Sequence, residues 1–284
     1  MSNREELFKI NRILVALDAS PNSLAALKAA VDLAISFDAE LAGLFVEDEN
    51  IFRLADWPFV YEVGLFTGIN RRVGSAELQR QIKLQARTVR RTFSGISQRA
   101  QVRWQFNTVR GPVITEVLTA ASEADVLVLG RTGRSLHRHG RLGSTVSGIL
   151  QEQFGLLLIM HEGSLARPPL AVVYDGSPTA DRALRAAQIL SSQIDETKPL
   201  LIFLLVQDDQ YVMRLQNQAI ASMGDRDMNI LFHQLKTKNA LQINDLLRRA
   251  GCGLLVLPTH IAFFNNNQLV SFLENLRWPV LLVT

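Results

Sequence analysis

Val126-Leu127-Val128-Leu129-Gly130-Arg131-Thr132-Gly133 is the stretch that decides the fold, because an apolar run passes here directly into a glycine-rich turn. The turn leads on to Gly143-Ser144-Thr145, and an amphipathic segment from Val146 to Gln153 predicts a helix. A buried strand, a glycine-rich loop and a helix start bring backbone N–H groups together, and such groups bind phosphate oxygens. The stretch therefore predicts an α/β sheet with a nucleotide-binding site beyond the end of one strand.

The second half of the chain repeats the first. Val15-Ala16-Leu17-Asp18-Ala19-Ser20-Pro21 is matched by Val172-Val173-Tyr174-Asp175-Gly176-Ser177-Pro178, and Leu127-Val128-Leu129 recurs as Leu255-Val256-Leu257. In the first pair of stretches, a serine suited to cap a helix N-terminus precedes a proline at the first helical position. Such self-similarity predicts two copies of one structural unit in a single chain.

Each half alternates apolar strands with amphipathic helices. In the first half we expect strands near 12–18, 40–46, 101–109, 125–130 and 156–161, and helices near 21–36, 75–95, 112–123 and 144–153. Continuous apolar runs are typical of parallel strands covered on both faces, and right-handed crossovers make the sheet doubly wound. The predicted fold class is α/β, with two tandem five-stranded parallel sheets in domains 1–163 and 168–284. The join falls where Gly163 to Pro169 breaks the pattern.

The last strands of the two halves, Leu156–Met160 and Val280–Thr284, predict how the copies meet. Each would otherwise be the exposed edge of its sheet, with a row of unpaired N–H and C=O groups. Antiparallel pairing within the chain closes both edges and makes the chain an internal pseudo-dimer. Whether two chains also form a homodimer is left open.

The composition is that of an ordinary globular protein. Of the 284 residues, 48% are hydrophobic and 20% are charged, which excludes a disordered chain. The formal net charge of +3 argues against a general nucleic-acid partner. The single cysteine, Cys252, lies beside a buried-strand pattern and is expected to be a packed thiol in a reducing compartment. The charged start of the chain and the lack of a long apolar run predict a cytoplasmic protein with no membrane partner.

Two segments stand apart from the repeat. Between Arg71 and Arg110 there are nine arginines and one lysine against one acid, Glu77. A solvated helix face is the preferred interpretation of this charge, and a docking surface for an acidic protein partner is the alternative. The insertion from Glu47 to Gly74 is rich in aromatic residues, which fits either an ordered flap over the sheet or a lid or partner-docking patch. Its aromatic residues are Phe52, Trp57, Phe59, Tyr61 and Phe66.

Each half resembles the universal stress protein domain, and the chain is similar to a tandem universal stress protein over nearly its whole length. The most specific element is a signature of Gly, two residues, Gly, nine residues, Gly and then Ser or Thr. Gly130, Gly133, Gly143 and Ser144 fill this signature without a spacing error. The resemblance implies a Rossmann-like, adenine nucleotide alpha hydrolase-like fold. It also implies ATP binding in a stress response, with ADP and AMP as the other candidate nucleotides.

The resemblance also implies roles for single residues. In ATP-binding members of the family, the aspartate that matches Asp18 holds the nucleoside end, and the backbone near Val46 contacts the base. The glycines and the serine of the signature hold the phosphates and ribose. Chemistry supports the same site, because Asp18 and Gly130 end parallel strands and sheets of this kind bind ligands there. The expected cofactor-binding residues are Asp18, Val46, Gly130, Arg131, Gly133, Gly143, Ser144 and Thr145.

Two points about this site remain open on the sequence alone. Asp18 has an alternative role as the acceptor of a local turn. The loop holds His137 and His139 but no Asp, Glu or Cys, so a metal site made by the loop alone is not expected. Mg²⁺ carried by the phosphates stays open, since that ion takes few protein ligands.

The second half departs from the signature. No glycine lies between Leu257 and Thr284, and Phe263 and Phe264 stand where phosphates would bind, so one nucleotide per chain is predicted. The sequence has no P-loop, no dinucleotide fingerprint and no convincing nucleophile–base pair, so no catalytic residue is assigned. A regulatory ATP-binding protein is the leading hypothesis. A slow ATPase or phosphotransferase and a nucleotide-independent interaction scaffold are the alternatives.

Overall fold

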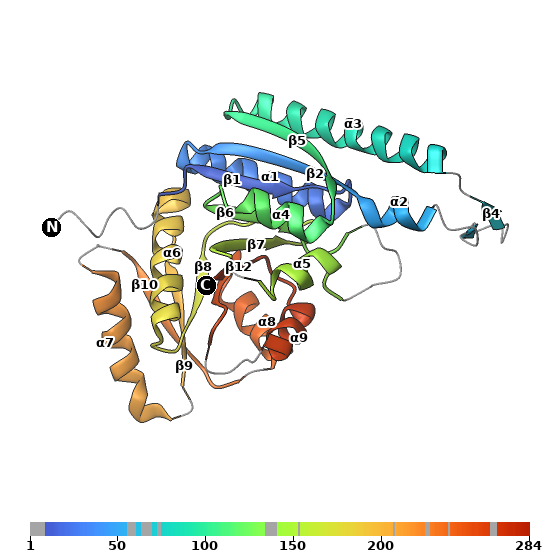
Figure 1. Ribbon diagram of the computed structural model, residues 1–284. Helices are drawn as coiled ribbons and strands as arrows, with labels where there is room; N and C mark the ends of the chain where they lie inside the picture. Colours follow the sequence, from blue (N-terminus) through green and yellow to red (C-terminus); the bar gives the residue numbers. More distant parts are fainter. Residues whose placement is uncertain are drawn as a thin grey trace.

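The fold is described from a computed structural model (Figure 1). The residues that it describes are 9–55, 61–63, 70–72, 75–133, 141–152, 154–206, 208–224, 228–237, 239–261 and 266–284. Among the helices in these ranges, none combines the length and the apolar character that a membrane span requires.

The strands of both halves form one 10-stranded sheet, in the order β10-β9-β8-β11-β12-β7-β6-β1-β2-β5. Within each half all neighbouring strands are parallel and follow the same order, which confirms the predicted doubly wound α/β class. The strands of the sheet are β1 (Arg12–Ala16), β2 (Glu40–Asp48), β5 (Trp104–Gly111), β6 (Val126–Gly130), β7 (Leu156–Met160), β8 (Leu170–Tyr174), β9 (Leu200–Leu205), β10 (Ile230–Leu235), β11 (Leu254–Pro258) and β12 (Val280–Val283).

The two halves are joined through β7 and β12, the one antiparallel pair in this sheet as described. Val280 lies opposite Ile159 and Val283 opposite Leu156. Every residue of both strands is buried, so apolar side chains cover both faces of the junction. The predicted pairing of the two last strands is confirmed, and the sheet has no open edge between the halves. We retain 1–163 and 168–284 as proposed domain boundaries.

The helices cover the two faces of the sheet, and each face carries one apolar core that contains residues of both halves. One face is covered by α1 (Pro21–Phe37), α3 (Ser75–Arg99), α6 (Pro178–Asp195) and α7 (Val212–Met223). The other is covered by α4 (Val113–Ala121), α5 (Ser144–Ile149), α8 (Ala240–Arg249) and α9 (Asn266–Asn275). Ser20 and Ser177 cap α1 and α6 through their side chains, as predicted. The cores are thus organised by sheet face rather than by half.

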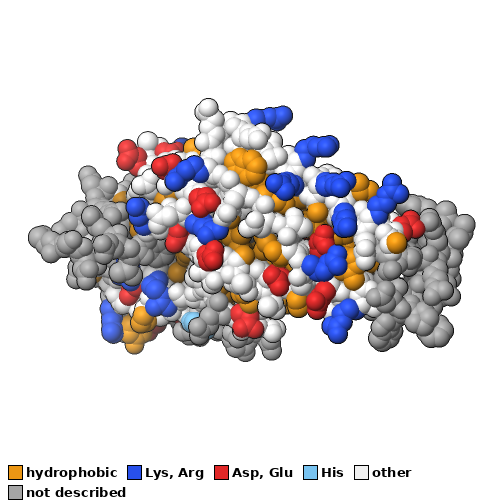
Figure 2. Space-filling view, turned by 45° about the horizontal axis from the view of Figure 1, so that its top comes forward, with side chains coloured by type: hydrophobic (Ala, Val, Ile, Leu, Met, Phe, Trp, Pro, Cys, Tyr) orange, Lys and Arg blue, Asp and Glu red, His pale blue; other side chains and the backbone are white. Residues whose placement is uncertain are grey.

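The basic segment lies mostly on α3, at the top of the view in Figure 1 and toward the viewer in Figure 2. Its six cationic side chains are all exposed, which agrees both with a solvated helix face and with a docking surface. They are Arg80, Lys83, Arg87, Arg90, Arg91 and Arg99. Cys252 is 3% exposed, and burial raises the pKa of its thiol to about 12, which confirms the packed thiol.

The aromatic insertion is described only in part. It contains α2 (Glu49–Ala55) and the antiparallel strands β3 (Tyr61–Val63) and β4 (Asn70–Arg72). Phe52 lies beneath the guanidinium of Arg110, whose carbon is 4.2 Å from the ring centroid. Trp57, Phe59 and Phe66 lie outside the described residues.

Two predicted helix ends are wrong by four residues, and in one of them α3 continues to Arg99 instead of ending near residue 95. The helix that starts at Ser144 ends at Ile149 instead of continuing to Gln153. The N–H groups of Leu150 and Gln151 donate to Val146 and Gly148, so the chain leaves the helix through a tighter turn. A weak helix former at Gly148 and the short distance to β7 favour this early end.

The turn after β1 contains a residue in a costly conformation, and this generates a prediction. Ala19 has a φ of 63°, whereas Gly176, its counterpart in the second half, has a φ of 80°. A left-handed backbone costs an alanine about 1–2 kcal/mol, and glycine avoids most of that cost. We expect Ala19→Gly to raise the free energy of unfolding by about 0.5–1 kcal/mol, measured by urea unfolding. Gly176→Ala is the matched control and should lower it, so a stabilised Gly176→Ala protein would contradict this explanation.

Candidate functional site

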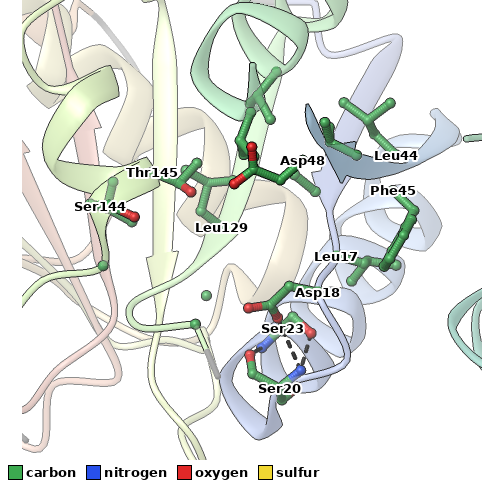
Figure 3. Close-up of a pocket in the computed structure, with 18 of the residues that line it drawn as sticks. Leu17, Asp18, Ser20, Ser23, Leu44, Phe45, Asp48, Leu129, Ser144 and Thr145 are labelled. Carbon is green, nitrogen blue, oxygen red and sulfur yellow. Dashed lines mark hydrogen bonds between the residues drawn. The ribbon is translucent and has the colours of Figure 1, made fainter. Parts of the chain in front are cut away.

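A cavity of about 650 Å³ lies beyond the carboxyl ends of β1, β2 and β6 (Figure 3). In a doubly wound sheet, this is where neighbouring crossovers leave the sheet on opposite faces and open a crevice. The cavity is lined by seven of the eight predicted residues, namely Asp18, Val46, Gly130, Gly133, Gly143, Ser144 and Thr145. The cavity lining therefore combines three separate segments of the first half, which end β1, end β2 and connect β6 to α5.

Asp18 stands at the centre of this lining, with its carboxylate in the cavity (Figure 3). Its Oδ1 accepts the N–H of Ser20 at 2.9 Å, and its carbonyl accepts Gln85 Nε2 at 2.9 Å. Asp175 makes the same turn in the second half, where its Oδ1 accepts the N–H of Ser177 at 3.0 Å. The local-turn role of Asp18 is therefore real. Its second oxygen, Oδ2, faces the position of Gly133.

The glycines of the signature solve different steric problems. A Cβ on Gly130 would lie 2.7 Å from backbone atoms of Asn22 and Ser23, so this glycine allows β6 to end against the start of α1. A Cβ on Gly133 would lie 2.8 Å from Asp18 Oδ2. Gly130 is thus required by packing against α1, while Gly133 lets the loop pass close to the carboxylate.

Gly143 closes the loop and opens α5. Its N–H donates to the carbonyl of Arg131 at 2.8 Å, and its carbonyl accepts the first helical bond, from Ser147, at 2.9 Å. No side chain caps the helix at this residue. The N–H groups of the first helical turn therefore have no partner within the helix and lie beside the cavity with the hydroxyl of Thr145.

The opposite end of the cavity is mostly apolar, and sequence reasoning found only Val46 there. This end is lined by Ile51 of α2, Ile82 of α3, and Val113 and Val117 of α4, so three different helices contribute to it. Their contribution has no local signature, because each lies on the apolar face of its own helix.

Asp48 is the polar residue that sequence reasoning missed. It follows Val46 by two residues on β2 and projects its carboxylate into the cavity (Figure 3). Its Oδ1 accepts the N–H of Asn50 at 3.0 Å, which ties the carboxylate to the start of α2. Strand periodicity could have identified it, because residues two apart in a strand share a face.

The charge of the described cavity wall is negative. Its lining includes the carboxylates of Asp18 and Asp48, and among the described residues no lysine or arginine lines it. The loop residues Arg134, His137, Arg138 and His139 lie outside the described part of the chain. Nor do the described residues bring together three His, Cys, Asp or Glu side chains able to bind a metal ion.

Arg131 is the predicted residue that the structure places elsewhere. Its guanidinium turns away from the cavity toward the second half, where Nη1 donates to the carbonyl of Leu276 at 2.8 Å and Nη2 donates to that of Glu274. Burial lowers the pKa of Arg131, while the Glu274 carboxylate opposes this shift. The expectation that the Arg131 side chain lines the nucleotide site is wrong, because carbonyl acceptors across the junction hold it.

His161 packs against Arg131 at the junction, with 3.1 Å between Nδ1 and Nη1. Burial lowers the pKa of His161 to about 4, and the positive charge of Arg131 acts in the same direction. A hydrogen bond with the backbone of Trp278 opposes both effects. His161 is therefore neutral at pH 7.

The corresponding region of the second half is built differently. Pro258 and Thr259 follow the apolar run where the first half has Gly130 and Arg131. Tyr174 is fully buried at the end of β8, and its hydroxyl donates to Asp181 at 2.7 Å. Gly176 packs against Leu215 and Gln218 of α7. The predicted obstruction by Phe263 and Phe264 falls outside the described residues.

The fold is that of a doubly wound α/β protein with a cavity beside a glycine-rich loop. The sequence model described as the universal stress protein family matches residues 9–153, half of the chain. The chain belongs to the universal stress protein family. No curated protein matches it.

Solved structures support this fold. A universal stress protein from Archaeoglobus fulgidus DSM 4304 has a TM-score of 0.73 at 17% identity, and the match covers 98% of this chain and 99% of that chain. The functionally unknown protein PA1789 from Pseudomonas aeruginosa PAO1 has a TM-score of 0.57 at 13% identity, with 96% and 92% covered. Both likenesses extend over both halves, which matches the single continuous sheet.

The His161 pKa generates a prediction about pH. Because the folded pKa of about 4 lies below the ordinary value of 6.5, the unfolded chain binds more protons between these two values. The His161 contribution is present above pH 6.5 and is lost as the pH falls toward 4. We expect urea unfolding to show a loss of about 2 kcal/mol between pH 7 and 4.5 that is absent in His161→Gln. Equal pH dependence of the two proteins would contradict the assignment.

Proposed function

We propose that this protein binds one adenine nucleotide, with ATP preferred, in the cavity of its first half and has a regulatory role in a stress response. The observation that carries the proposal is the convergence of Asp18, Val46 and the glycine signature on one cavity of about 650 Å³. That volume lies within the usual range of small-molecule and cofactor sites. Family membership supports the same ligand class.

The cavity suggests an orientation for the nucleotide. The apolar end near Val46 and Ile82 suits the base, and the start of α5 at Ser144 suits phosphate oxygens. The Asp18 carboxylate between these ends is placed for the ribose hydroxyls. In this proposed orientation the triphosphate would lie against the backbone N–H groups at the start of α5.

The negative charge of the described cavity wall favours a triphosphate that binds together with Mg²⁺. The carboxylates of Asp18 and Asp48 would repel a bare polyphosphate, and Mg²⁺ bound to the phosphates would reduce this repulsion. Both carboxylates already accept one backbone N–H, which fixes their orientation. We therefore propose that the nucleotide binds as its magnesium complex.

A charge placed at the loop closure tests the site. Gly143→Asp adds a carboxylate beside the proposed phosphates, and we expect it to raise the Kd for Mg-ATP at least tenfold, about 1.4 kcal/mol, in calorimetric titrations. Gly95→Asp is the matched control, since a Cβ at Gly95 on α3 meets nothing within 4 Å. Equal affinity in all three proteins would sink the proposed site.

The twin aspartate turns separate the ligand role of Asp18 from its structural role. Asp18→Ala and Asp175→Ala each remove one acceptor of a backbone N–H, so each should destabilise the fold by about 1 kcal/mol. Only Asp18→Ala should also weaken Mg-ATP binding. Parallel thermal melts and titrations of the two variants measure both effects. Equal affinities of the two variants for Mg-ATP would mean that Asp18 has only the structural role in the turn.

Two other functions remain distinguishable in the same experiments. Steady ATP turnover that disappears in Asp18→Ala would favour a slow ATPase or phosphotransferase. A wild-type protein without bound nucleotide after acid extraction, and without calorimetric binding, would favour a scaffold. The exposed cationic face of α3 is the surface that an acidic protein partner would then use.

A further inference from the structure

The two described flanks of the glycine loop both contact the end of α9, which belongs to the second half. On one flank, Arg131 donates to the carbonyls of Glu274 and Leu276. On the other flank, the N–H of Leu142 donates to Glu274 Oε1 at 3.2 Å. The loop is therefore held across the junction at both ends by one helix terminus.

These contacts complete the C-terminal cap of α9. The last carbonyls of a helix lack intrahelical donors, and cations near them are stabilising. The carbonyl between the two that Arg131 binds, that of Asn275, accepts Asn244 Nδ2 at 2.9 Å from α8. Three successive carbonyls at this terminus thus have side-chain donors, and the nucleotide loop of the other half provides two of them.

The start of the loop is also fixed from within the first half. Asn22 Nδ2 donates to Thr132 Oγ1 at 2.7 Å, and Ser20 Oγ donates to the Thr132 carbonyl at 3.4 Å. Thr132 lines the cavity, whereas the adjacent Arg131 side chain lies behind it against α9. Neighbouring residues of one short segment therefore link the cavity to the second half.

We propose that Arg131 is a positioning residue that couples nucleotide binding in the first half to the docking of α9 in the second. This inference rests on the proposed function and adds its regulation. By capping α9, Arg131 holds the described start of the glycine loop, up to Gly133, where it lines the cavity proposed for the nucleotide. The half without the glycine signature thus supports the loop of the half that has it. Coupling is reciprocal, so bound nucleotide also stabilises the end of α9.

The experiment compares full-length variants by nucleotide affinity and by amide hydrogen exchange. In wild type we expect Mg-ATP to slow exchange at the end of α9, around Asn275 to Arg277, at least threefold. Arg131→Met keeps the length of the side chain but loses the donors, and we expect a Kd for Mg-ATP about tenfold higher with no protection of α9. Arg131→Lys, which keeps the charge, should recover part of both effects.

Variants at two further positions, Arg141 and Glu274, serve as controls for the test. Arg141→Met removes the charge of an exposed arginine near the loop end, so it should leave the protection of α9 intact even if it weakens nucleotide binding. Glu274→Ala removes the acceptor of the Leu142 N–H, whereas Glu274→Gln retains an oxygen there. We expect the alanine variant alone to lose affinity and protection, and this pair also serves if Arg131→Met does not fold.

The outcomes separate this inference from the proposed function. If wild type binds Mg-ATP and both Arg131→Met and Glu274→Ala match it in affinity and α9 protection, the coupling is overturned and the nucleotide site stands. If Arg141→Met loses protection to the same degree as Arg131→Met, general loop charge explains the effect and positioning by Arg131 is overturned. If wild type binds no nucleotide, both proposals fail.

Discussion

The antiparallel pairing of β7 with β12 is the interaction on which the rest of the structure depends. It converts two sheets, each with an apolar last strand, into one sheet whose cores run through both halves. Without it, two rows of backbone donors and acceptors and their apolar side chains would face water. The same pairing brings α9 to the back of the glycine loop, so the geometry of the candidate site is a consequence of the junction.

The two halves share the same strand order and the same turn after the first strand, but they differ in the residues of the loop beside the cavity. Asp18 and Asp175 make the same turn, and Gln85 and Gln218 donate from matching helices to the backbone of that turn. These shared contacts belong to the architecture of the fold. The differences mark the site, since the first half keeps glycines at the loop whereas the second has Pro258 and Thr259 there.

The success and failure of sequence-based inference follow from the range of each interaction. Continuous apolar runs identified the strands, because a strand that is buried on both faces has apolar residues at nearly every position. Gly130, Gly143 and Ser144 were found because their spacing along one loop is itself the signature. Asp48 was missed although strand periodicity could have revealed it.

Taken alone, the sequence determined the repeat, the parallel α/β sheets, the antiparallel junction and most of the loop residues that line the cavity. These features depend on burial patterns and on spacing within single segments. The direction of the Arg131 side chain was decided only by the tertiary structure. In isolation, an arginine within a glycine loop suits a phosphate, but in the folded chain α9 ends beside it and offers part-buried carbonyls that need donors. The physical reason is that hydrogen-bond acceptors from distant parts of the chain compete for the same donor, and no local pattern encodes which of them lies within reach.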